Sequence, residues 1–370
     1  MSGRGRHRVA RLAARALPRY VSIVAAACFV AVATLAATGA EARDAASPSV
    51  TQMAGQLLIV RMVGRTPSTG FLARIRHGEI GGVVLYADNY GAAGPTLLVR
   101  KLQRAAEQGK QPRLLIAIDQ EGGSVKRLPG PPTVAPSEMT TAAVAQAQGR
   151  ETARNLRGYG IDVDFAPVLD VGHGGFITSR SFGDTPSDVA TRAVAFAHGL
   201  ALGGVVATAK HFPGLGYAPA NTDKARAIIR ASAPQLNADL LPYKRAIAAG
   251  VPMIMVSTAL YPKFGIHVPA ACSPTAVTQL LRGRLGFRGV VVTDTLYSPA
   301  VNAYKPTPEA AVAAIAAGVD IVLPGGSTRT ADVTSEAAYR AIVAGVRSGA
   351  LPRSTVAAAY ARVLALKRSL

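Results

Sequence analysis

The segment Leu-Leu-Ile-Ala-Ile-Asp at residues 114–119 shows the pattern that decides the fold: a short apolar run that ends in a polar side chain. Continuous apolar runs of this length predict strands that are buried on both faces, as in a parallel sheet. Seven similar runs occur along the chain, near Leu57–Arg61, Gly82–Tyr86, Asp162–Pro167, Val205–Lys210, Met253–Ser257, Gly289–Asp294 and Asp320–Leu323. We therefore predict eight strands.

Helical segments are expected between these runs, because apolar residues there recur at three- and four-residue spacing. The expected helices are Pro95–Gln108, Thr141–Gly158, Ser187–Leu202, Ser232–Ala249, Pro274–Leu285, Pro308–Ala317 and Ser335–Gly349. Strands that alternate with helices predict an α/β fold. Eight such units favour a single-domain (β/α)8 TIM-type barrel, and an open doubly wound sheet is the alternative.

The composition of the 370-residue chain suits a barrel. With 49% hydrophobic and 17% charged residues the chain can bury a large core, which excludes the disordered and fibrous classes. Only 5% of the residues are aromatic and none is Trp. This argues against a flat carbohydrate-binding module, which relies on aromatic stacking, and favours an enzyme with a pocket.

The first 42 residues have the features of an export signal. Six Arg precede an apolar run from Val21 to Leu35, and Ala40-Glu41-Ala42 then offers a cleavage site flanked by small residues. An uncleaved membrane anchor is the alternative, because the run approaches the ~20 residues that span a bilayer. We predict a signal peptide or N-terminal membrane anchor at 1–42, the barrel domain at 43–370, and a secreted or envelope-associated protein.

The chain is strongly basic, with a net charge of +20. Loss of residues 1–42 would remove six Arg and one Glu and leave about +15, which favours anionic partners. Export argues against nucleic acid and for association with an anionic cell envelope, although a solvated surface without a partner is equally compatible. Only Cys272 would remain, so no disulfide within the chain is expected.

Polar side chains stand where a barrel places its active site, at the C-terminal ends of the strands. Asp119, the pair Lys210-His211 and Asp294 each end an apolar run. A carboxylate there can bind sugar hydroxyls or act as a nucleophile, and the cationic groups can donate to hydroxyls. Asp119 and Asp294 could instead cap the helices that follow, and a lone His is more often structural.

Six segments carry polar residues at strand ends or in the loops that follow. They are Leu114-Leu-Ile-Ala-Ile-Asp-Gln-Glu-Gly-Gly, Asp164-Phe-Ala-Pro-Val-Leu-Asp170, Arg180-Ser-Phe-Gly, Lys210-His-Phe-Pro-Gly, Leu241-Pro-Tyr243 and Leu285-Gly-Phe-Arg-Gly-Val-Val-Val-Thr-Asp294. The same segments occur in this order in glycoside hydrolase family 3. Over roughly residues 50–370 the chain resembles the single-domain β-N-acetylglucosaminidase branch of that family, which acts on cell-wall and related amino sugars.

The resemblance implies a retaining exo-glycosidase, most similar to a β-N-acetylhexosaminidase, that forms a glycosyl-enzyme on Asp294. A peptidoglycan-derived saccharide is one candidate substrate. No cofactor is implied, and no metal is expected, because the six histidines show no His-x-His or His-x-x-x-His pair. The residues that would hold the terminal sugar are Asp119, Arg127, Arg180, Lys210 and His211.

The family pattern changes at the position of the general acid/base. The branch usually carries an Asp-Ser-His segment here, in which the His transfers the proton and the Asp orients it. In this chain Asn221 stands at the Asp position and Asp223 at the His position. Asp223 could be a substitute acid/base, the donor could lie elsewhere, with Asp184 and Glu121 as candidates, or the barrel could be catalytically impaired and bind cell-wall saccharides. An active hydrolase is expected rather than an impaired barrel, because Asp294 and Lys210-His211 are present together, and Asp223 is its candidate acid/base.

Overall fold

The computed structural model describes residues 48–370, of which 49–370 form one compact unit. The leader predicted at 1–42 lies outside the described residues. Across the part of the chain from Pro48 onward, the helices are too short or too polar to cross a membrane.

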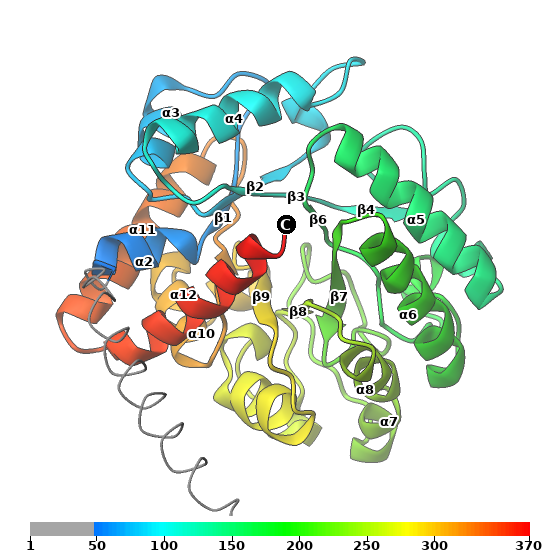
Figure 1. Cartoon of the computed structure of the whole chain (residues 1–370). Helices are drawn as coiled ribbons and strands as arrows, with labels where there is room; N and C mark the ends of the chain where they lie inside the picture. Colours follow the sequence, from blue (N-terminus) through cyan, green and yellow to red (C-terminus); the bar gives the residue numbers. More distant parts are fainter. Residues whose placement is uncertain (1–47) are drawn as a thin grey trace, which may run out of the picture. The chain divides into compact units, whose positions relative to one another are not determined.

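Eight parallel strands form a closed barrel (Figure 1). Their order around the barrel is their order along the chain, which is what consecutive βα units produce. The barrel closes between its first and last strands, where Leu58 bridges Val322 and the Val322 N–H donates to the Leu57 carbonyl at 2.9 Å. This confirms the predicted (β/α)8 barrel. The strands are β1 (Ile59–Arg61), β2 (Gly82–Leu85), β3 (Leu115–Ile118), β6 (Val163–Asp164), β7 (Val206–Phe212), β8 (Met253–Val256), β9 (Val290–Thr295) and β10 (Ile321–Leu323).

Helices surround the barrel, and several begin at Ser or Thr residues whose hydroxyls accept a backbone N–H of the first turn. The α-helices are α2 (Val50–Gln56), α3 (Thr69–Arg76), α4 (Thr96–Gln108), α5 (Ala142–Gly158), α6 (Pro186–Leu202), α7 (Ala233–Ala238), α8 (Leu241–Ala248), α9 (Pro299–Asn302), α10 (Thr307–Ala316), α11 (Ala331–Arg347) and α12 (Arg353–Arg368). The other helical segments are the π-helix η6 (Thr275–Arg284) and the 3₁₀ turns η1 (Ala87–Asn89), η2 (Pro136–Glu138), η3 (Thr178–Arg180), η4 (Pro262–Phe264) and η5 (Ala270–Cys272).

The structure corrects the sequence prediction in three places. The single helix expected over Ser232–Ala249 is two, α7 and α8, because Pro242 has no N–H to continue one helix through this point. The helix expected over Pro274–Leu285 is the wider π-helix η6. Asp119 is followed by an antiparallel hairpin of β4 (Gln120–Gly122) and β5 (Val125–Lys126), so it does not cap a helix.

A buried lysine joins the C-terminal helix to the end of the barrel opposite the C-terminal strand ends. The Lys367 ammonium of α12 donates to Gln56 Oε1 at 2.6 Å and to the carbonyl of Gly81, just before β2, at 2.7 Å. Burial removes this group from water and lowers its pKa to about 7, against the opposing charge of Asp162. The helix is therefore held by a group that titrates near neutrality.

We expect the stability of the wild type to rise relative to a Lys367→Met variant as the pH increases from about 7 to about 9. In that range the unfolded lysine keeps its proton, up to a pKa of about 10.4, while the folded one releases it, so alkali favours the folded state. The difference in free energy of unfolding should grow by about 1.4 kcal/mol per pH unit in urea titrations. If the stabilities of the wild type and of Lys367→Met changed in parallel with pH, the lowered pKa of Lys367 would be contradicted. The matched control is Lys101→Met, on the exposed face of α4.

Candidate active site

A cavity of about 250 Å³ opens at the C-terminal ends of the strands. Phe165, Leu215, Met255 and Leu323 contribute apolar parts of its wall. The other lining side chains are mostly polar or charged, so the site suits a ligand with many hydroxyls. All seven site residues predicted from the sequence line this one cavity: Asp119, Arg127, Arg180, Lys210, His211, Asp223 and Asp294.

The barrel brings these residues together from distant parts of the chain. Asp119 directly follows β3, Lys210 and His211 lie in β7, and Asp294 lies in β9. The carboxyl ends of parallel strands meet at the same end of a barrel, so residues far apart in sequence become neighbours there. The remaining three come from loops and turns: Arg180 ends η3, Arg127 follows β5 and Asp223 lies in the loop after β7.

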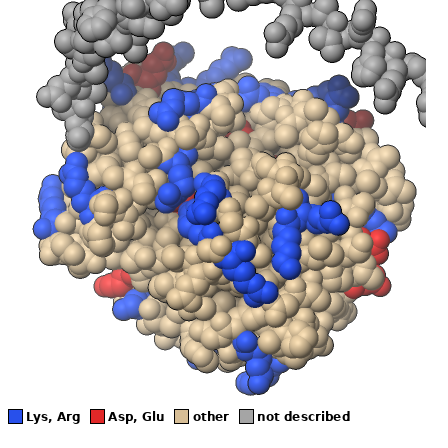
Figure 2. Space-filling model, turned by 60° about the horizontal axis from the view of Figure 1, so that its bottom comes forward, with Lys and Arg blue, Asp and Glu red and all other residues tan. Residues whose placement is uncertain are grey.

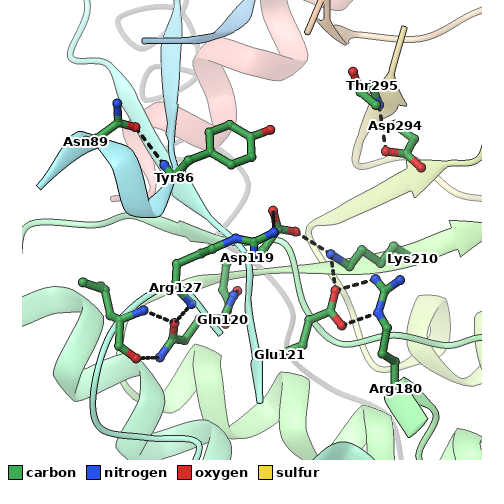
Figure 3. A network of polar contacts seen from close by, with 12 residues as sticks. Tyr86, Asn89, Asp119, Gln120, Glu121, Arg127, Arg180, Lys210, Asp294 and Thr295 are labelled. Atoms are coloured by element: carbon green, nitrogen blue, oxygen red, sulfur yellow. Dashed lines mark hydrogen bonds and ion pairs between the residues drawn. The ribbon is translucent and has the colours of Figure 1, made fainter. Parts of the chain in front are cut away.

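Four charged side chains form a buried network on one side of the cavity (Figure 3). The Lys210 ammonium lies 2.7 Å from Asp119 Oδ1 and 2.6 Å from Glu121 Oε1. Arg180 donates to both Glu121 oxygens, at 2.8 and 2.7 Å. Burial opposes ionisation of Asp119 and Glu121, but Lys210 and the guanidinium groups outweigh it and lower the pKa of both carboxyls. Both therefore remain ionised acceptors.

Arg127 is positioned by a buried glutamine in the hairpin. Gln120 Oε1 accepts the backbone N–H groups of Arg127 at 3.0 Å and Leu128 at 2.9 Å, and its amide donates to the Leu128 and Pro131 carbonyls. The turn that carries Arg127 is thus held from inside the protein, and the arginine extends into the cavity beside Asp119 (Figure 3).

His211 is oriented by a fully buried carboxylate. Asp170 Oδ2 lies 2.7 Å from His211 Nδ1, and Oδ1 accepts the backbone N–H groups of His211 and Leu215. Burial opposes ionisation of Asp170, but His211 and these backbone donors lower its pKa. Ionised Asp170 accepts a hydrogen bond from a protonated Nδ1, which leaves Nε2 as the other polar atom of the ring. Asp170 stands in a strand-end motif, but its role as the partner of His211 required the structure.

Asp294 differs from Asp119, Glu121 and Asp170 because it has no cationic partner. Its Oδ1 accepts the Thr295 N–H at 2.7 Å, and no Lys, Arg or His nitrogen of residues 48–370 lies within 4.0 Å of it. Figure 3 shows it apart from the network around Glu121. Ser298 caps the next helix, α9, so the alternative of Asp294 as a helix cap is wrong. A half-buried, unpaired carboxylate retains its nucleophilic lone pairs.

Asp223 lies on the rim of the cavity, open to solvent on its outer side. Its backbone N–H donates to Asn221 Oδ1 at 2.9 Å. Partial desolvation and the nearby charge of Asp294 raise the pKa of Asp223, although His211 and Arg180 oppose the shift. Of the two other candidates for the proton donor, Glu121 forms ion pairs with Lys210 and Arg180. Asp184 is exposed to solvent and does not line the cavity.

The loop that carries Asp223 is anchored by residues that the sequence analysis did not identify. Tyr217 stacks on His173 with ring centroids 3.9 Å apart, and His173 Nε2 lies 3.0 Å from Asp239 Oδ2. Gly216 passes so close to this anchor that an added Cβ would lie 2.3 Å from the Val171 carbonyl oxygen. These three contacts join three separate segments, so no local sequence signal could have shown them.

Arg61 and Tyr86 also line the cavity and were not predicted. Both lie at the ends of apolar runs, so the rule that led to Asp119 and Asp294 could have found them. Across residues 48–370, no group of three or more His, Cys, Asp and Glu side chains is arranged to hold a metal ion.

Comparison with known proteins assigns the chain to a family. The family described as "Glycosyl hydrolase family 3 N terminal domain" matches residues 49–366. An "uncharacterized secreted glycosyl hydrolase" of Arthroderma benhamiae is 33% identical over 92% of this chain and 99% of its own length. A "beta-hexosaminidase" of Stenotrophomonas maltophilia is 34% identical over 67% of this chain and 77% of its own length.

A solved structure agrees with these sequence relatives. The family 3 β-N-acetylglucosaminidase of Paenibacillus sp. str. FPU-7 superposes with a TM-score of 0.82 at 32% identity, over 87% of this chain. This chain spans 63% of the length of that protein. The family match covers the whole barrel, including every residue of the cavity. This chain is therefore a glycoside hydrolase that belongs to glycosyl hydrolase family 3.

Proposed function

We propose that the protein is a retaining exo-β-N-acetylhexosaminidase that uses Asp294 as nucleophile and Asp223 as general acid/base. The observation that carries the proposal is the Asp294 carboxylate without a cationic partner, which shares one cavity with the charged network of Asp119, Lys210 and Arg180. The sugar class is supported by the printed names of the relatives from Stenotrophomonas and Paenibacillus.

The dimensions of the cavity support removal of single terminal sugars. Its volume of about 250 Å³ lies below the ~300–1,000 Å³ of pockets for drug-sized ligands, so it suits one pyranose ring. Asp119, ionised and fixed by Lys210, can accept from two neighbouring hydroxyls. Arg180, His211 and Lys210 can donate to other oxygens of the same ring.

In the first step the Asp294 carboxylate attacks the anomeric carbon. The bond to the leaving oxygen breaks as Asp223 gives that oxygen its proton, and a glycosyl ester forms on Asp294. In the second step Asp223 takes a proton from water, whose oxygen attacks the anomeric carbon and releases Asp294. The raised pKa of Asp223 suits the first role, and ionisation of Asp223 after proton transfer suits the second.

Trapping of the glycosyl-enzyme tests this proposal. The protein is incubated with a 5-fluoro-N-acetylglucosaminyl fluoride, digested and analysed by mass spectrometry. A peptide that contains Asp294 should gain the mass of one fluorosugar, and the protein should release 4-nitrophenol from its β-N-acetylglucosaminide. Saturable sugar binding without adduct or turnover would instead support a catalytically impaired, saccharide-binding barrel.

We expect Tyr217→Ala to lower kcat by roughly 10- to 100-fold while sugar binding is retained, because the stack on His173 positions the Asp223 loop. The sugar-binding network lies on other elements and should be unaffected. Steady-state kinetics and calorimetry with N-acetylglucosamine separate the two effects. Tyr217→Phe, which keeps the stacking ring, is the matched control, and an equal loss of activity in both variants would contradict the assignment.

We also propose that the protein is exported and associates with an anionic cell envelope. The relative from Arthroderma is named as secreted, and in the face drawn in Figure 2 Lys and Arg side chains are widespread while Asp and Glu are few. N-terminal sequencing of the protein from culture supernatant should begin near Arg43 if residues 1–42 are cleaved. Salt should release envelope-bound protein if charge holds it there.

A further inference from the structure

Two arginines flank one tyrosine on a wall of the cavity, apart from the network around Glu121. Arg61 ends β1, Tyr86 follows β2, and Arg127 follows β5. The Arg61 guanidinium carbon lies 4.6 Å from the Tyr86 ring centroid, and that of Arg127 lies 5.9 Å from it. In Figure 3 the Tyr86 ring points across the site toward the side that carries Asp294. Arg61 and Arg127 therefore line the same cavity that a bound sugar would occupy.

The hydrogen-bonding capacity of these two guanidinium groups is poorly used. Arg61 makes long contacts, 3.4 Å to the Gly326 carbonyl and 3.3 Å to the half-exposed Asp88, and Arg127 only approaches Asp119, at 3.9 Å. The Nε atoms of both are buried without a hydrogen-bond partner among residues 48–370. Arg180, in the same cavity, by contrast makes two short hydrogen bonds to Glu121, at 2.7 and 2.8 Å.

Carboxylates of the protein satisfy this pair only in part. Asp88 forms an ion pair with Arg61 at 3.3 Å but does not line the cavity. Asp119 is held by Lys210, and Asp294 has the nucleophile position. Two partly desolvated cations with free donors favour an anionic acceptor over a neutral hydroxyl, because a charge-assisted hydrogen bond is about twice as strong. The planar fork of a guanidinium matches the two oxygens of a carboxylate.

We propose that Arg61 and Arg127 form a carboxylate-binding subsite, so that the substrate is an acidic saccharide. This rests on the proposed function and specifies the substrate class of the same site. Burial and Asp119 raise the pKa of Tyr86, so its hydroxyl stays protonated and can supply a further donor beside the two arginines.

Calorimetry with free monosaccharides tests the subsite without any need for turnover. Two matched pairs are used: glucose with glucuronate, and N-acetylglucosamine with its 3-O-(1-carboxyethyl) ether. The acidic member of at least one pair should bind about tenfold more tightly or better, and added salt should reduce this advantage. The pair that shows the effect locates the carboxylate at C6 or at C3.

Variants assign the effect to the two arginines. Arg61→Met should remove the advantage of the acidic sugar and leave the affinity for the neutral one, Arg61→Lys should keep part of it, and Arg100→Met, on the exposed surface of α4, should change nothing. Equal affinities within both pairs, or an equal loss for neutral and acidic sugars in Arg61→Met, would overturn the proposal. Acidic-sugar binding without any aryl glycoside hydrolysis would instead count against the proposed function alone.

Discussion

Replacement of Asp294 by Asn is expected to lower kcat for an aryl β-N-acetylglucosaminide by at least about 10³-fold. An amide at this position cannot form the glycosyl ester, and it carries no charge to stabilise the positive anomeric centre. Affinity for N-acetylglucosamine should change little, because the network around Lys210 is separate from Asp294 (Figure 3). Steady-state kinetics and calorimetry measure the two quantities.

Two controls make this result specific to the nucleophile. Asp332→Asn removes an exposed carboxylate on α11 that does not line the cavity, and should leave kcat unchanged. The fluorosugar adduct should be absent from the Asp294→Asn variant. If Asp294→Asn retained more than a tenth of the wild-type kcat, another residue would have to be the nucleophile.

Replacement of Asp223 by Asn should have the second-largest effect, a loss of about 10²–10⁴-fold that depends on the leaving group. Hydrolysis of a disaccharide should fall most, because its alkoxide leaves poorly without a proton. With a 2,4-dinitrophenyl glycoside the rate of the first step should fall much less, because its phenolate leaves without a proton. Comparison of the two substrates therefore separates loss of the proton donor from loss of folding or binding.

The pH profile gives an independent measure of the same group. The pKa of Asp223 is raised, so the acid stays protonated to higher pH than an ordinary aspartate, and activity should fall as the pH rises through that pKa. Asp223→Asn should lose this alkaline limb. Asp184→Asn is the matched control, since Asp184 was the other aspartate considered as donor and lies outside the cavity. Loss of the limb in Asp184→Asn instead would contradict the assignment to Asp223.

The strands and most of the helices followed from local patterns. Runs such as residues 114–119 and 289–294 are apolar at nearly every position, so both of their faces must be buried. Among short elements, a strand inside a parallel sheet is buried on both faces. The helix over Ser232–Ala249 was predicted wrongly because the apolar spacing continues across Pro242, while the backbone hydrogen bonding does not.

The candidate site was predictable where its residues end strands. Asp119, Lys210, His211 and Asp294 converge because the strands that carry them run parallel around one barrel. Tyr217, His173 and Asp239 could not be found in this way, because their contacts join loops and a helix end whose approach depends on packing.

The sequence by itself determined the barrel, the family and the positions that face the cavity, since each depends on periodicity and on the order of motifs along the chain. The tertiary structure decided how the charges are shared. It places Glu121 rather than solvent between Lys210 and Arg180, leaves Asp294 without a cation, and gathers Arg61 and Arg127 around Tyr86. These pairings depend on distances of a few ångströms between strands that are far apart in sequence, and electrostatic energies at that range are set by geometry and burial.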